Sequence, residues 1–520
     1  MKYNKSLGSR GLRVIFFKHI GNLFNSSKST HHLSNANRIT LTLSLMGVAL
    51  LLISSGEAFS ASVNAKGCIV CHAVRLDRNH SLACTTCHRG NDSTGEKSEA
   101  HANLIAQPAH PEAMAATCGP CHPRQVDGIG AASHFTLKNL VNLVRRAFGA
   151  TTDLQSMVEI PESDSPRDAL ALADDLLRRR CLRCHLYYKG DDYPAVTHGT
   201  GCAACHLEFQ NGRLASHAFL AAPGDRQCLS CHYGNRVGFD FHGRFEHDLN
   251  VEYRTPYTTK DEHFRPFGVE YHELAADIHQ QRGLVCIDCH PGSQLMAAGK
   301  PGPSCADCHD ADLLDKNLPD RVRKSGPGYI FLAGTERKQH TLPIMTDPAH
   351  ATHGGKISCQ VCHAQWSFAD SGKHLLRSDY DEFDQWDRLT TQGSSEVTKL
   401  LENNIDFSKN EIIPAMKDKI YFRDRPGVWY KGYGMRRWET IFLEKNEKGE
   451  ISVVRPLLDY FLSWQDGNGL VHIDSHPSEA GNNGLHRYTP HTTGKAGLFY
   501  RQRLENLHFA EAAKENKQGD

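Results

Sequence analysis

The stretch "THGTGCAACH", residues 197–206, contains the motif that decides the fold of this chain. Cys202 and Cys205 are three residues apart, His206 follows them directly, and His198 lies four residues ahead of the pair. The pattern C-x-x-C-H occurs nine times and uses all 18 cysteines of the 520 residues. We number these motifs one to nine; their cysteines are Cys68 and Cys71, Cys84 and Cys87, Cys118 and Cys121, Cys181 and Cys184, Cys202 and Cys205, Cys228 and Cys231, Cys286 and Cys289, Cys305 and Cys308, and Cys359 and Cys362.

The histidine that ends every motif separates three explanations. A disulfide scaffold explains an even number of cysteines but not an adjoining histidine. Zinc ribbons need two half-sites per metal ion and have no use for a histidine directly after the second cysteine. Covalent attachment of haem c uses all three residues, because the thiols bond to the haem vinyl groups and the imidazole is the proximal iron ligand. The sequence therefore predicts nine haems, with proximal ligands His72, His88, His122, His185, His206, His232, His290, His309 and His363.

Histidine is abundant enough to supply the second axial ligands as well. Of the 32 histidines, nine belong to motifs and three precede residue 61, which leaves 20. A histidine just ahead of a motif, such as His80 or His198, is badly placed to bind the haem that follows and well placed to bind a neighbouring one. The preferred distal candidates are His80, His110, His134, His198, His217, His242, His279, His350 and His353, with His101, His247, His263, His272 and His340 in the wider set. Mostly bis-histidine ligation implies low reduction potentials.

The spacing of the motifs predicts the fold class. Residues 68–363 leave about 33 residues per haem, too few for an ordinary hydrophobic core. We therefore expect a multihaem cytochrome c fold, with mainly irregular chain and short α-helices wrapped around haems, over residues 61–370. The motifs fall into three groups, which suggests trihaem units at 68–122, 181–232 and 286–363.

Two helices and a haem-free C-terminal region stand out from this pattern. Residues 133–149 have an apolar face formed by Leu137, Leu140, Val141, Val144 and Phe148, and residues 165–181 have Ser165 as the expected N-cap of a helix that runs into motif four. Residues 371–520 contain no cysteine, and "NEKG" and "DGNG" predict β-hairpins there. We expect a β-containing cap on the haem region, or alternatively a docking surface or lid. Its histidines His472, His476, His486 and His491 are further candidates to cap a haem, and a separate metal site near Asp474 is a lesser alternative.

Residues 1–60 have the character of an export signal with a long basic n-region. Residues 39–53 are apolar, Arg38 precedes them, and Ala58 and Ser60 suit cleavage before Ala61. Fifteen residues fall short of the roughly twenty that span a membrane, so an uncleaved anchor is the lesser alternative. Removing seven basic and one acidic side chain leaves 52 basic and 58 acidic, a formal charge of −6 that does not suit nucleic-acid binding. We expect a periplasmic protein, with cell-surface or outer-membrane association as alternatives.

The nine motifs make the chain resemble the multihaem c-type cytochromes of bacterial respiration, over residues 68–363. A weaker resemblance, in the dense haem region followed by a haem-free one, is to cytochromes found with selenite or tellurite reduction systems. The resemblance implies electron transfer in anaerobic-type respiration and redox partners such as periplasmic or membrane cytochromes and a quinol-oxidising complex.

Some relatives in that class are enzymes, so a second function stays open. Pentahaem nitrite reductases carry a C-x-x-C-K motif, which this chain lacks, whereas proteins like hydroxylamine oxidoreductase keep C-x-x-C-H throughout and leave one iron accessible. We expect an electron carrier rather than an enzyme, with no catalytic residue assigned. The alternative is a multihaem reductase of a small oxyanion or nitrogen compound, for which the run with His232, Arg236, His242, Arg244 and His247 is the first candidate.

Overall fold

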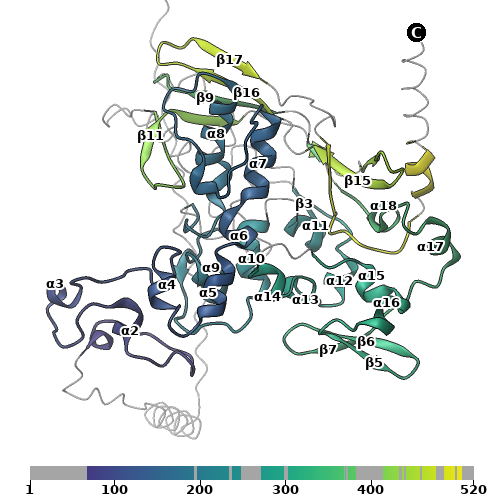
Figure 1. Cartoon of the computed structure of the whole chain (residues 1–520), viewed down its shortest axis with the longest axis horizontal. Helices are drawn as coiled ribbons and strands as arrows, with labels where there is room; N and C mark the ends of the chain where they lie inside the picture. Colours follow the sequence, from purple (N-terminus) through teal and green to yellow (C-terminus); the bar gives the residue numbers. More distant parts are fainter. Residues whose placement is uncertain are drawn as a thin grey trace, which may run out of the picture. The chain divides into compact units, whose positions relative to one another are not determined.

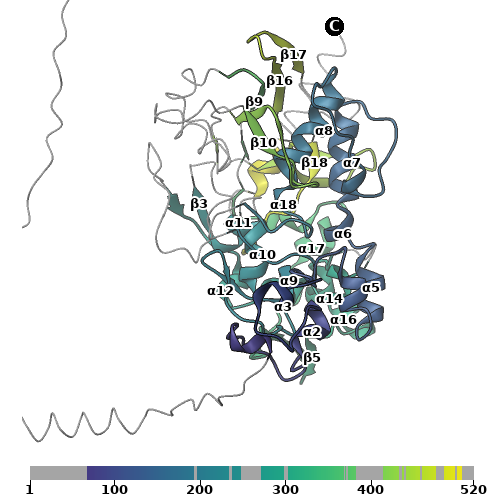
Figure 2. The same ribbon diagram turned by 90° about the vertical axis from the view of Figure 1, so that its left-hand side faces the viewer.

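The computed structural model describes most of the chain after residue 66 (Figures 1 and 2). The described residues are 67–191, 196–233, 237–246, 271–297, 302–367, 369–370, 373–381, 414–431, 436–437, 441–456, 460–475, 485–497, 500–505 and 507. The expected export signal lies outside them. Residues Lys66–Asp520 form one compact unit. Within the described part, no helix combines the length and the apolar character that crossing a membrane requires.

Most helices in the described part are one or two turns long, as a chain wrapped around haems predicts. The 3-10 turns are η1 Cys68–Val70, η2 Met157–Glu159 and η3 Cys181–Arg183. The α-helices are α2 Cys84–His88, α3 Lys97–Ala100, α4 Met114–Thr117, α5 Pro123–Ile129, α6 Ser133–Thr136, α7 Lys138–Ala147, α8 Ala169–Arg179, α9 Cys202–His206, α10 Asp225–His232, α11 Gly238–His242, α12 Ile278–Gln281, α13 Cys286–Cys289, α14 Gly292–Leu295, α15 Ala306–His309, α16 Ala311–Lys316, α17 Pro348–His353 and α18 Cys359–His363.

The strands form several small sheets. Two-stranded sheets pair β1 Phe209–Gln210 with β2 Arg213–Leu214, β3 Arg244–Glu246 with β4 Tyr271–Glu273, β8 Ala369–Asp370 with β13 Arg436–Arg437, and β10 Ala415–Lys417 with β11 Asp424–Pro426. The larger sheets have the orders β5-β6-β7 (Val322–Ser325, Gly328–Ala333, Lys338–Thr341), β12-β9-β16-β17 (Val428–Lys431, Lys373–Ser378, Tyr460–Gln465, Val471–Ser475) and β14-β15-β18 (Phe442–Lys445, Ile451–Pro456, Leu485–Arg487).

Both predicted hairpins are confirmed, and one sheet was missed. Strands β14 and β15 pair antiparallel across "NEKG", and β16 and β17 pair antiparallel across "DGNG". The sheet β5-β6-β7 lies between motifs eight and nine, where we expected little strand. Its central strand β6 alternates buried and half-buried side chains, and Gly326, at φ +58°, lies in the turn before it.

The two predicted helices are present with corrected ends. The first is divided, because Leu137 adopts φ +47° between α6 and α7 and interrupts the helix. Leu140 was assigned wrongly to its apolar face, since 42 % of the residue is exposed. The second helix begins later than predicted, because the carboxylate of Asp168, not Ser165, accepts the hydrogen bond from the Ala171 N–H.

Helices α7 and α8 share one apolar core with the C-terminal strands. Val141 and Leu176 from the helices and Leu375, Trp429 and Leu462 from β9, β12 and β16 are all buried in it. Both views show α7 and α8 side by side, next to β9 and β16 (Figures 1 and 2). The change in composition near residue 370 is therefore not a boundary of this core.

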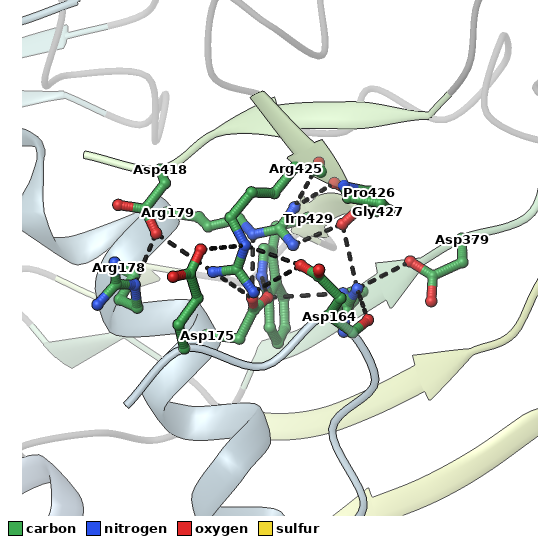
Figure 3. Close-up of polar contacts among 12 residues, drawn as sticks. Asp164, Asp175, Arg178, Arg179, Asp379, Asp418, Arg425, Pro426, Gly427 and Trp429 are labelled. Atoms are coloured by element: carbon green, nitrogen blue, oxygen red, sulfur yellow. Dashed lines mark hydrogen bonds and ion pairs between the residues drawn. The ribbon is translucent and has the colours of Figure 1, made fainter. Parts of the chain in front are cut away.

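A buried network of arginine and aspartate joins α8 to the same strands (Figure 3). Asp175 accepts hydrogen bonds from Arg179 Nε at 3.0 Å and Trp429 Nε1 at 2.9 Å, and Arg377 Nε lies 3.5 Å away. Arg178 Nε donates to Asp418 at 2.6 Å. Because a buried charge that loses its partner is costly, this network fixes the helix that leads into motif four.

One glycine is required beside this network. Gly427 has φ +89°, and a Cβ there would overlap the carboxylate of Asp379 and the guanidinium of Arg377. Its carbonyl accepts a hydrogen bond from Arg179 Nη1 at 2.6 Å, so the bend between β11 and β12 presents backbone oxygen to the buried arginine.

The first part of the described chain is built differently. Residues 67–113, which we call the N-terminal arm, contain motifs one and two and no buried apolar side chain. Inside motif one, 62 % of Ile69 and 57 % of Val70 are exposed. The arm therefore lacks a polypeptide core of its own.

Candidate functional site

Each motif lies in or beside a tight turn, which brings its three functional side chains together. Residues three and four apart in a helical turn face the same side. The backbone N–H of the motif histidine bonds the carbonyl of the first cysteine at 2.8–3.0 Å in motifs one, three, seven and eight. In motif five Gly201 precedes the turn at φ +55°, where a Cβ would overlap the carbonyl oxygen of Ala109.

Seven motif histidines lie opposite a histidine that belongs to no motif. The ring centroids of every pair are 6.0–6.4 Å apart. The pairs are His72 with His101, His122 with His80, His88 with His217, His232 with His134, His309 with His279, His290 with His491, and His363 with His350.

This separation is what two imidazoles on opposite sides of one metal ion require. An imidazole nitrogen binds a transition-metal ion at about 2.0 Å and lies about 1.1 Å from its ring centre, so the two centroids come out about 6.2 Å apart. The interplanar angles range from 3° to 84°, so the pairs share a distance but not a stacking geometry. The residues at these seven motifs therefore fit a haem iron.

Hydrogen bonds orient many of these rings. The Nδ1 atoms of His88, His206, His309 and His363 lie 2.7–2.9 Å from backbone carbonyl oxygens, so each ring carries its proton on Nδ1. Among the distal candidates, Nδ1 of His80 and of His279 each contacts a carboxylate, at 2.9 and 2.8 Å. Such a partner leaves Nε2 as the metal-binding nitrogen and fixes the ring orientation.

The preferred distal candidates divide into two groups. Five of them, His80, His134, His217, His279 and His350, lie opposite motif histidines. For His80 and His279 that histidine belongs to a motif other than the one that follows in the sequence. The structure does not pair His110, His198, His242 or His353 with a described motif histidine. Two further histidines lie opposite motif histidines although they were not preferred candidates. These are His101, from the wider set, and His491, from the C-terminal region.

Motif four differs from the others. His185 Nε2 lies 2.9 Å from the carbonyl oxygen of Lys419, and its Nδ1 accepts a hydrogen bond from the Tyr187 N–H at 3.2 Å. A carbonyl only accepts, so Nε2 carries the proton here. Its ring neighbours are the phenols of Tyr187 and Tyr188, both 6.1 Å away. Burial lowers the pKa of His185 to about 3, and Cys184 departs from helical geometry at φ −116° and ψ 75°. At this motif the histidine does not present its metal-binding nitrogen.

A buried polar cluster surrounds motif four. Lys419 Nζ lies 2.8 Å from the carboxylate of Asp191 and 3.3 Å from the hydroxyl of Tyr188, which donates to Asp191 at 2.9 Å. Arg183 Nη1 lies 3.4 Å from the same carboxylate. Burial opposes ionisation of Asp191, but Arg183 and Lys419 lower its pKa to about 2. The C-terminal region thus contributes Lys419 to a site otherwise built from residues that follow α8.

Proximity between cysteines of different motifs gives the spatial order of the motifs. The structure describes all 18 cysteines, and none of them forms a disulfide. Thiols of different motifs that lie close enough to shift each other's pKa are Cys68 with Cys84, Cys118 with Cys202, Cys184 with Cys231, Cys228 with Cys286, and Cys305 with Cys359. Electrostatic interactions add Cys87 with Cys118, Cys205 with Cys228, and Cys289 with Cys308.

The resulting order differs from the sequence order. The spatial order is one, two, three, five, six, seven, eight and nine. Motif four lies beside motif six and outside this row. The proximity of motif three to five and of motif six to seven crosses the three groups seen in the sequence, so neighbouring groups lie close together. A distance-dependent process can therefore pass along eight motifs, with motif four as a side position.

The run suggested for an enzymatic site is described only in part. His232 lies opposite His134, with ring centroids 6.1 Å apart. His242 ends helix α11 against Phe241, and burial lowers its pKa. Arg236 and His247 lie outside the described residues.

The chain matches no protein-family model, no curated protein and no solved structure. In the described part, no group of three or more histidine, cysteine or acidic side chains gathers around a point where it could hold a metal ion. A haem iron takes only two side chains, one from each face.

Proposed function

We propose that the chain is a multihaem c-type cytochrome that carries electrons along covalently bound haems. The single observation that carries this proposal is the set of seven imidazole pairs at 6.0–6.4 Å, each joining a motif histidine to one outside the motifs. When bound, haem supplies one-electron redox chemistry. The residues of the chain hold it, cap it on both faces and keep neighbouring attachment points in contact.

The exposed arm supports the same proposal. Ile69 and Val70 lie inside motif one with most of their surface exposed, although side chains of this kind are usually buried. A porphyrin attached at Cys68 and Cys71 is a large apolar group, and it would supply the burial that the arm lacks. We propose export to the periplasm, or from there to the cell surface, with periplasmic or membrane cytochromes or a quinol-oxidising complex as partners.

The decisive experiment is to count the haems and their ligands in the exported protein. Pyridine haemochrome absorbance with intact-mass measurement should give nine haems per chain and no zinc. The EPR spectrum of the oxidised protein should be dominated by low-spin signals. Protein that carries zinc or disulfides instead of haem would refute the proposal.

The ring angles make that spectrum more specific. His134 and His232 are nearly perpendicular at 84°, whereas His350 and His363 are nearly parallel at 3°. Perpendicular imidazoles act on different iron d orbitals and keep them close in energy, which gives one very large g value; parallel imidazoles separate them and give a rhombic signal. His134→Ala should remove the first kind of signal and His350→Ala the second.

A further inference from the structure

Two aspartates bond the distal histidines at motifs three and eight, and they carry an inference that rests on the proposed function and goes beyond it. Asp77 Oδ2 lies 2.9 Å from His80 Nδ1, and Asp277 Oδ1 lies 2.8 Å from His279 Nδ1. An ionised carboxylate only accepts, so each ring donates through Nδ1. At His363, in contrast, the acceptor of the Nδ1 proton is a neutral backbone carbonyl.

Asp77 also bonds the segment that carries the distal histidine of motif two. Its Oδ2 accepts a hydrogen bond from the Phe219 N–H at 2.9 Å, and the Phe219 ring lies 4.6 Å from the ring of His80. His217, two residues before Phe219, lies opposite His88 of motif two. One carboxylate therefore holds the distal ring of motif three and the backbone next to the distal ring of motif two.

Asp277 has the same arrangement at the other end of the row. Its Oδ2 accepts a hydrogen bond from the Thr493 N–H at 2.7 Å, and the Ile278 N–H donates to the Thr493 carbonyl at 2.8 Å. His491, two residues before Thr493, lies opposite His290 of motif seven. This carboxylate therefore holds the distal ring of motif eight and the backbone next to the distal ring of motif seven.

The two arrangements share one plan but not one local sequence. Motifs two and three lie next to each other in the row, and so do motifs seven and eight. The local sequences differ, because "DRNH" at 77–80 places the aspartate three residues before the histidine and "DIH" at 277–279 places it two before. The same contacts thus arise twice from different segments, which favours a role beyond local chain geometry.

A carboxylate on an axial imidazole changes the redox properties of the iron that the imidazole binds. Accepting the Nδ1 proton raises the basicity of the ring, and a negative charge nearby favours the oxidised form, so both effects lower the reduction potential. Within the described part of the chain, neither aspartate forms an ion pair with lysine or arginine. The side chain of Asp277 is 4 % exposed and that of Asp77 is 20 % exposed, so water screens Asp277 less.

We propose that Asp77 and Asp277 are positioning residues that lower the reduction potentials of the haems at motifs three and eight by acting through His80 and His279. Each also ties the distal ligands of two adjacent haems together. Motifs five, six and seven lie between these two haems in the row. Lowering both potentials therefore favours electrons on this middle stretch.

The test is a redox titration of the full-length, haem-loaded protein, followed by visible absorbance and EPR. Asp277→Asn keeps an oxygen acceptor for the ring and removes the charge. It should raise the equilibrium constant for reduction of one haem about tenfold, which is about 59 mV for a one-electron couple. Asp77→Asn should raise that of a different haem by less, about threefold. The number of low-spin haems should not change. If Asp277→Asn does not fold, Asp77→Asn, at the more exposed site, supplies the measurement.

Asp466→Asn is the matched control. Asp466 Oδ2 lies 2.7 Å from His472 Nε2, so this pair has the same chemistry, but His472 is not paired with a described motif histidine. The substitution should leave every potential unchanged.

A haem-deletion variant locates the effect. With Cys305 and Cys308 replaced by alanine, motif eight carries no haem, so Asp277→Asn should no longer shift a potential, whereas Asp77→Asn should act as before. In the protein with all its haems, Asp277→Ala also leaves the Thr493 N–H without this acceptor. It should therefore change the low-spin EPR signals of two haems.

Potentials that neither Asp277→Asn nor Asp77→Asn shifts, or an equal shift in Asp466→Asn, would overturn this inference and leave the proposed function intact. An effect of Asp277→Ala on the EPR signal of one haem alone would overturn the tie between neighbouring distal ligands. A protein without haem would overturn the proposed function itself.

Discussion

The N-terminal arm and the surroundings of motif four show two ways of supporting a C-x-x-C-H motif. The arm has two motifs, short helices and no buried apolar side chain. Motif four follows a helix of eleven residues whose apolar face packs against the C-terminal strands and whose arginines are paired inside the core. The arm has to gain its core from what it binds, whereas motif four lies on a core that the polypeptide builds alone.

The largest effect should come from removing haem attachment at the arm. With Cys84 and Cys87 replaced by alanine, the arm loses the haem of motif two, and no buried apolar side chain of the arm can take its place. Hydrogen exchange in residues 67–113 should therefore rise about a hundredfold or more. Exchange in α7, α8 and the C-terminal strands should change by less than about threefold. Mass-spectrometric exchange measures both regions in one sample.

The matched control is the same double substitution at Cys181 and Cys184. It should leave α8 and its core protected from exchange, because Leu176 and Trp429 belong to an apolar core that is buried without haem. An arm that stays protected without the haem of motif two, or an α8 core that opens without the haem of motif four, would remove the contrast between the two regions.

The next largest effect concerns the buried network under motif four. Asp175→Ala removes the acceptor of Arg179 Nε and of the indole N–H of Trp429, together with one carboxylate partner of Arg377, which should cost about 3–5 kcal/mol of stability. Thermal and denaturant unfolding of the haem-loaded protein would measure this loss.

Asp153→Ala is the control, because its pairing with Arg146 is half-exposed and screened by water. It should change stability very little. A small effect of Asp175→Ala would mean that the arginine network does not hold α8 to the C-terminal strands.

The sequence predicted features that are encoded within a short segment. It did not predict contacts between residues that are far apart in the sequence. A C-x-x-C-H motif and a hairpin turn such as "NEKG" are encoded within about ten residues, so they could be read directly. The Leu137 break and the Asp168 cap are decided by packing and by one hydrogen bond, and predictions of helix ends are correspondingly weaker. His491 lies 201 residues from His290 in the sequence, and spacing holds no sign of that pairing.

The role of Lys419 could not be predicted for the same reason. Nothing in its own segment marks it as a partner of His185, because the contact forms only when the β10-β11 hairpin is bound by Arg178 and Arg179 of α8. Composition suggested a separate region after residue 370, whereas the shared core and the buried arginines join that region to α8. Local patterns predict the cofactor, and tertiary packing decides which sites differ from one another.

A smaller effect should follow from cutting one link between the arm and the rest of the chain. His217 lies outside the arm and opposite His88 of motif two. His217→Ala should convert one low-spin haem to high-spin and raise exchange in the arm about tenfold, since the arm then loses one of its attachments. EPR and hydrogen exchange report the two changes separately.

His353→Ala is a suitable control, because it removes a histidine one turn from His350 that is not paired with a described motif histidine. It should leave both the spin states and the exchange of the arm unchanged. If the two substitutions gave the same result, the ring pairing in the structure would not reflect ligation.

The smallest effect we expect is acid sensitivity around motif four. The pKa of Asp191 is lowered to about 2 in the folded protein, against an ordinary value near 4. A lowered pKa means that the carboxylate stabilises the fold above about pH 4 and that this contribution, about 2 kcal/mol, is lost as the pH falls from about 4 to about 2. Asp191→Asn should therefore be less stable than the wild type at pH 6, with a difference that narrows below pH 4. Melting temperatures of both proteins across this range measure it. Asp466→Asn alters a half-buried surface carboxylate whose pKa is also about 2. It should show a smaller difference, because its partner His472 is exposed and screened by water. Equal pH dependence in the two variants would mean that burial beside motif four does not increase the contribution of the Asp191 carboxylate to stability.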